Sequence, residues 1–162
     1  MEPINECRLE MLRELKDADA ESDLRGLVEV LVYPLAEQLR SQGTGYYYIP
    51  IVAQITGHPN YYAIAQNRSR HSAGLQRLLA LINKNLADIP EPLILQRFGM
   101  ALRQVFNELA DYQRINLPGP GVADSGMPLF INGLVDAVTA QFCAPVSAAT
   151  LQELGRKPKK SA

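Results

Sequence analysis

One stretch, residues 90–142, most constrains the fold, because it holds two long apolar helical patterns separated by a segment that cannot be helical. The first pattern runs from about residue 91 to residue 114, and the second from about 125 to 142. Between them residues 118–121 read Pro-Gly-Pro-Gly, where proline lacks a backbone donor and glycine favours helix poorly. The sequence therefore predicts a helical hairpin.

Each arm of this hairpin has a wide apolar arc. On a helical wheel the arc of the first arm covers roughly 140° of the circumference, against about 100° for an ordinary surface helix. The flank of the second arm carries Gly133, Ala140 and Ala144, which are small enough to let another helix approach closely. We therefore expect the hairpin to pack on its own domain and on a second copy of the chain. The arcs contain Ile94, Leu95, Phe98, Ala101, Leu102, Val105, Phe106 and Leu109, then Phe130, Ile131, Leu134, Val135, Ala137, Val138 and Phe142.

The other segments also have helical patterns, so we expect an all-α fold. Residues 1–154 should form one domain, and residues 155–162 a disordered basic tail. A strand is an alternative only at residues 46–52, where Pro50 argues against it. The apolar stripe of the first helix would contain Ile4, Cys7, Met11 and Leu15. Further helices are predicted at about 4–16, to about 43 after a cap at Ser22 or Asp23, at 45–56 with a later start because of Pro50, at 61–86, and at 148–154 after a cap at Ser147. Residues 57–60, which include His58, should form a turn, and Asn60 should cap the helix at 61–86.

Composition and charge exclude several classes of function. The net charge is −1, which disfavours a surface built to neutralise phosphates. Cys7 and Cys143 form no CxxC pair, and two thiols in a domain of this size fit a reducing cytoplasm. We find no metal-ligand cluster, cofactor motif, catalytic motif or signal peptide, and no apolar run of about 18 residues that would span a membrane. We expect a cytoplasmic protein that is not an enzyme.

Two groups of side chains suggest a small-molecule cavity. Arg68 and His71 interrupt an apolar helix face, where they would give a ligand polar contacts. Alternatively, Arg68 extends its guanidinium to the edge and His71 is a hydrogen-bonded core histidine. The tyrosines at 46–48, 61 and 62 suit a ligand pocket and equally suit ordinary half-buried packing.

Several short runs, taken in their order and spacing, resemble a known family over nearly the whole chain. These are residues 3–9 (PINECRL), 24–28 (LRGLV), 33–36 (YPLA), 53–55 with 58–59 (AQI and HP), 74–81, 132–136 (NGLVD) and 144–150 (APVSAAT). Together they resemble the regulatory domain of tetracycline-repressor (TetR) family transcription regulators.

This resemblance implies a helical domain that binds a small effector in a cavity among its helices. It also implies a homodimer held by the last two long helices, as a four-helix bundle. In the family, effector binding shifts the helix that joins this domain to the DNA-binding helix-turn-helix, which here would be the first helix. The chain begins where that DNA-binding domain would end, so we expect DNA contact only through a domain that these residues do not include.

Two functions follow as expectations. The first is an effector-binding and dimerisation domain of a TetR-like regulator; the alternative is a stand-alone helical protein that pairs with a full-length regulator and blocks it. The expected cavity residues are Tyr47, Ile51, Arg68, His71, Leu75, Phe98 and Leu102. The expected dimer contacts are Leu95, Phe106, Leu109, Phe130, Leu134, Ala137, Val138 and Gln141.

Overall fold

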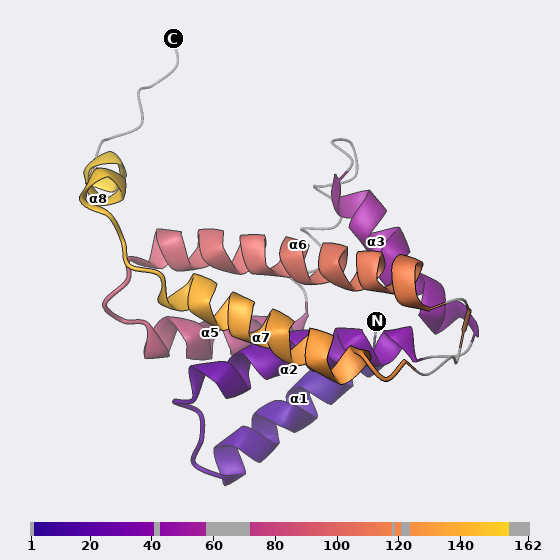
Figure 1. Cartoon of the computed structure of the whole chain (residues 1–162). Helices are drawn as coiled ribbons and strands as arrows, with labels where there is room; N and C mark the ends of the chain where they lie inside the picture. Colours follow the sequence, from indigo (N-terminus) through magenta and orange to yellow (C-terminus); the bar gives the residue numbers. More distant parts are fainter. Residues whose placement is uncertain (1, 41–42, 58–71, 118, 121–123, 156–162) are drawn as a thin grey trace.

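The computed structural model describes residues 2–40, 43–57, 72–117, 119–120 and 124–155, and the regular secondary structure in these ranges is helical (Figure 1). No strand occurs in them, so the all-α class is confirmed, and residues 46–52 are helical. The elements are α1 (Glu2–Asp17), α2 (Leu24–Leu39), the 3₁₀ helix η1 (Gly43–Tyr47), α3 (Tyr48–Gly57), α5 (Ala73–Asn85), α6 (Glu91–Asn116), α7 (Met127–Cys143) and α8 (Ala148–Gly155).

The hairpin of α6 and α7 forms close to its predicted limits. The two helices pack on one another, and both also contact α2. Each begins with a proline in its first turn, Pro92 in α6 and Pro128 in α7, where the missing backbone donor costs nothing. Among the described helices α7 therefore has two neighbours, α2 and α6, and α6 has four, since it also contacts α3 and α5. These neighbours explain the wide apolar arcs of both helices.

The most central helix is α2, which contacts α1, α3, α5, α6, α7 and η1. Asp23 caps it as expected, accepting a hydrogen bond from the backbone N–H of Arg25 at 3.0 Å. Helix α2 ends at Leu39, earlier than the predicted end near residue 43. Its side chains from Leu27 to Leu39 are mostly buried, so the core lies around this helix.

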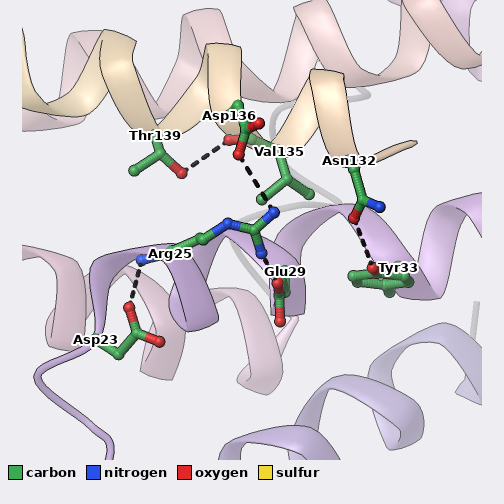
Figure 2. Close-up of polar contacts among 8 residues, drawn as sticks. All are labelled: Asp23, Arg25, Glu29, Tyr33, Asn132, Val135, Asp136 and Thr139. Atoms are coloured by element: carbon green, nitrogen blue, oxygen red, sulfur yellow. Dashed lines mark hydrogen bonds and ion pairs between the residues drawn. The ribbon is translucent and has the colours of Figure 1, made fainter. Parts of the chain in front are cut away.

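Polar side chains flank the contact between α2 and α7 (Figure 2). Arg25 of α2 forms an ion pair with Asp136 of α7 at 3.2 Å and a second one with Glu29. Tyr33 donates a hydrogen bond to Asn132 Oδ1 at 3.4 Å. These groups orient α7 on α2. Because they are solvent-exposed or half-buried, they add little to the stability of the fold.

The fourth predicted helix is shorter than expected. Ser72 has an extended backbone, with φ −81° and ψ 109°, and α5 begins only at Ala73, so a helix running unbroken from 61 to 86 was a wrong prediction. The cause is a distant residue: Asn5 Oδ1 of α1 accepts hydrogen bonds from Gly74 N and Ser72 Oγ, both at 2.8 Å. Asn5 thus caps α5 from another helix. The expected turn at His58 and cap at Asn60 lie outside the described residues.

The inward face of α1 is rotated from the predicted stripe. Its buried residues are Ile4, Arg8 and Leu12, whereas Cys7 is exposed. Helix α1 packs on α2 and α5. A Cβ added at Gly74 of α5 would lie 3.0 Å from Arg8 Cβ, so this glycine allows the close approach of the two helices.

Helix α8 is the last described element and is exposed along its length. Ser147 Oγ accepts a hydrogen bond from Thr150 N at 3.2 Å, which confirms the predicted N-terminal cap. In Figure 1 this helix stands apart from the other helices. Gly155, expected to begin the disordered tail, is the last residue of α8, and residues 156–162 of that tail lie outside the described residues. Among the described helices, none alone is long and apolar enough to cross a membrane; only α7 and α8 together would be, as a pair bent by 61°.

Candidate functional site

An open pocket lies between the η1–α3 segment and the second half of α6, with a volume of about 460 Å³. Helices α3 and α6 pack on one another, and the pocket forms beside that contact. The ring of Tyr46 meets the ring of Tyr47 edge to face, with 5.2 Å between centroids. The lining residues are Tyr46, Tyr47, Pro50, Ala53, Gln54, Asn107, Ala110, Asp111, Gln113 and Arg114.

Two hydrogen bonds tie η1 to the end of α6 and shape this pocket. Gln113 Nε2 donates to the backbone carbonyl of Tyr46 at 2.7 Å. The Tyr46 hydroxyl donates to the backbone carbonyl of Leu117 at 3.1 Å. Both bonds are buried and join residues about seventy positions apart, so the pocket wall is fixed by tertiary contacts.

Gln113 leaves one polar atom without a partner. Its side chain is only 3% exposed, and Oε1 makes no hydrogen bond. The amide orientation follows from its neighbour: the Tyr46 carbonyl only accepts, so Nε2 must face it and Oε1 must be the unpaired atom. Leaving a buried acceptor unpaired costs about 1–3 kcal/mol. A ligand N–H or O–H that reached Oε1 would remove this cost.

The rim of the pocket carries opposite charges. Asp111 and Arg114, one turn apart on α6, form an exposed ion pair at 3.0 Å. Asn107 and Gln54 add uncharged polar groups to the lining. An aromatic wall, one buried acceptor and a balanced rim suit a small, planar, neutral molecule that carries a hydrogen-bond donor.

Tyr112, beside Gln113 on α6, has a different environment. Its ring stacks on Phe130 of α7, with 4.2 Å between centroids, and its hydroxyl donates to Asp124. Burial, together with the hydrogen bond and the negative charge of Asp124, raises the pKa of Tyr112 to about 12. This phenol therefore stays protonated at neutral pH and joins the two arms of the hairpin near the loop between them.

The expected cavity residues are not gathered in this pocket. Among the described residues, Tyr47 alone of that set lines it, and Tyr47 and Ile51 are each 53% exposed. Leu75 and Phe98 are buried in the core, and Leu102 packs against that core. Arg68 and His71 lie outside the described residues.

Tyr46 and Gln113 carry the polar chemistry of the pocket. Tyr46 belongs to the tyrosine group that suits a ligand pocket, although it is not among the expected cavity residues, and Gln113 was not predicted. Gln113 follows Val105 and Leu109 at four-residue spacing on the buried face of α6. A polar residue continuing an apolar face at this spacing is the signal that indicates it.

The expected dimer residues divide into two groups. Leu109, Leu134 and Val138 are buried in the chain's own core, so in this single chain they present little surface to a second copy. Leu95 and Ala137 are exposed. Phe106, Phe130 and Gln141 are half-buried, and Gln141 Nε2 donates to the Arg97 carbonyl at 3.2 Å.

Small and apolar side chains lie on the outer face of α7, which we define as Leu129, Gly133, Ala137 and Ala140. All four are exposed, Leu129 at 81%. A Cβ added at Gly133 would meet nothing within 4 Å. This face points away from the core, so it is open to another helix in the described structure.

No family model, no curated protein and no solved structure matches the chain. Within the described residues, no group of three or more His, Cys, Asp or Glu side chains is placed to hold a metal ion. The pocket at Gln113 and the outer face of α7 are therefore the features from which function is inferred.

Proposed function

We propose that this chain is the small-molecule-binding and dimerisation domain of a TetR-like transcription regulator. The observation that carries the proposal is a pocket lined by Gln113, whose buried Oε1 has no hydrogen-bond partner. Buried polar groups are nearly always satisfied, and the unsatisfied ones need an explanation. A ligand with a donor explains Gln113.

The order of elements supports the family assignment. The last two long helices, α6 and α7, form a hairpin, as the resemblance implies, and α1 packs on α2 and α5 ahead of it. A ligand between η1–α3 and α6 would change the packing of α6, which contacts α5, and α5 contacts α1. The ligand would shift α1 only by its difference in affinity for the two arrangements.

The Gln113→Leu variant tests the pocket. A panel of planar molecules with N–H donors, such as purines, indole and benzamide, is screened by thermal shift against the wild-type chain. For each molecule that binds, we expect Gln113→Leu to weaken binding by about tenfold or more, because a hydrogen bond to a buried group is lost. The matched control is Gln96→Leu, at an exposed position on the same helix. If affinity is equal in wild type and Gln113→Leu, or no panel member binds, the pocket is not the ligand site.

The Ala137→Glu variant tests the dimer. A glutamate on the outer face of α7 would place unpaired charge between two copies, so we expect sedimentation velocity to change from dimer to monomer. The circular dichroism spectrum should stay helical because Ala137 is exposed in the single chain. Ala80→Glu, at an exposed position of α5, is the matched control and should remain dimeric. A wild-type monomer, or a dimer that tolerates Ala137→Glu, would contradict the proposed assembly.

A further inference from the structure

Arg8 is a buried cation on the inner face of α1. It is 4% exposed, and the buried Ile4 and Leu12 lie one turn before and after it on the same face. Across from it is Gly74 of α5, whose missing side chain lets the stem of Arg8 approach. A guanidinium at such a position is unusual, since arginine is almost never fully buried unless it is paired.

Arg8 has no carboxylate partner within this chain's side chains. Every Asp and Glu of the sequence lies in the described residues, because the ranges outside them contain neither type. The ion pairs of the described residues join other arginines to these carboxylates, and none includes Arg8. Its Nε is buried and makes no hydrogen bond.

The guanidinium nevertheless keeps its charge. Burial lowers the pKa of Arg8 to about 10, and the nearby Tyr48 and Cys7 raise it only in part. At neutral pH the group is therefore protonated, and no Asp or Glu side chain forms an ion pair with it. Burying an unpaired charge is unfavourable, so an anion supplied from outside the chain would stabilise Arg8.

We propose that Arg8 binds the carboxylate of a small organic acid with an apolar body. One positive charge matches one negative charge, whereas a doubly charged phosphate would leave an excess charge in an apolar setting. A planar carboxylate also matches the fork of a guanidinium. Ile4 and Leu12, which are buried in the core, lie one turn before and after the charge on the same face of α1.

The proposed Arg8 site rests on the proposed regulatory role and assigns a ligand class to it. It is separate from the Gln113 pocket, whose lining does not include Arg8. Arg8 lies on α1, one turn after Asn5, which caps α5. An acid bound at Arg8 would therefore act directly on the helix that the resemblance assigns to coupling. A molecule bound at Gln113 would act through α6 and α5.

The experiment measures binding of straight-chain monocarboxylates from acetate to dodecanoate, and of benzoate, to the wild-type chain by thermal shift and calorimetry. Each acid is paired with its uncharged amide, and inorganic phosphate is a separate arm. We expect at least one acid to raise the melting temperature while its amide does not. Arg8→Met should weaken the binding of that acid by about tenfold or more, and Arg13→Met, at an exposed position of the same helix, should leave its binding unchanged.

Other results would overturn the proposal. These are acids that bind no better than their amides, phosphate preferred over every acid, or equal binding to wild type and Arg8→Met. Without ligand, Arg8→Met should melt no lower than wild type, since it removes an unpaired buried charge; lower melting of both Arg8→Met and Arg8→Lys would make Arg8 a structural residue instead. Such failures leave the tests on Gln113 and Ala137 untouched, because those use other ligands and other measurements.

Discussion

Replacing Leu134 with glutamate should destabilise the chain severely and lower its urea midpoint. Leu134 lies on the buried face of α7 and is 6% exposed, and α7 packs on both α2 and α6. The change removes a buried leucine and places a carboxylate without a partner in the core. Together these effects should cost about 4 kcal/mol or more, against a typical total stability of about 5–15 kcal/mol. Far-UV circular dichroism with urea titration measures the loss.

The matched control is Ala137→Glu, three residues further along α7 on its outer face. This variant should keep the helical signal, and its urea midpoint should fall by no more than the loss of the dimer contact would cause. The pair separates two roles of the helix, since Leu134 contributes to folding and Ala137 is available to a partner. If Leu134→Glu gave a folded monomer, Leu134 would face a second copy, and the core described around α2 and α7 would be wrong at this position.

Replacing Gly74 with valine should destabilise the chain by about 3 kcal/mol through overpacking. A Cβ at Gly74 would lie 2.9 Å from Asn5 Oδ1 and 3.0 Å from Arg8 Cβ, and 3.4 Å from the Asn5 carbonyl. Asn5 could move its side chain, but it would then lose its hydrogen bonds to Ser72 and Gly74. Arg8 Cβ is close to the backbone and has little room to move. Helix α1 must therefore separate from α5.

The opposite result is expected at Gly99, in the middle of α6. A Cβ there would meet only Arg103 Nη1, at 3.7 Å, which is ordinary contact. Gly99→Ala should therefore stabilise the chain by about 0.5–1 kcal/mol, the gain in helix propensity. Urea denaturation of both glycine variants measures the expected loss of stability for Gly74→Val and the expected gain for Gly99→Ala. If Gly74→Val were as stable as wild type, the close approach of α1 and α5 would not exist.

Much of the helical architecture could be predicted from the sequence, because it depends on neighbours along the chain. The limits of α6 follow from an apolar pattern with a period of 3.6 residues and from Pro92 in its first turn. Asp23 and Ser147 cap their helices through backbone groups two or three residues away. Pro50 delayed the start of α3, as predicted, because it removes a donor that only the first turn can spare.

The candidate site was much less predictable. Arg8 and Gln113 both continue an apolar face at four-residue spacing, yet nothing in the local sequence says whether such a side chain is paired. Of the expected cavity residues, Tyr47 lines the pocket, whereas Leu75 and Phe98 belong to the core. Whether a buried polar side chain finds a hydrogen-bond partner depends on groups in other helices, such as the Tyr46 carbonyl that accepts from Gln113.

The sequence by itself determined that this protein is helical and where its long hairpin turns, because helix formation and breaking depend on residues within one or two turns. Only the tertiary structure decided that α2 lies at the centre, that Asn5 caps α5, and that Arg8 and Gln113 are buried with unpaired atoms. These facts depend on contacts between residues far apart in the chain. Their energies come from excluding water around specific polar atoms, which no local pattern records.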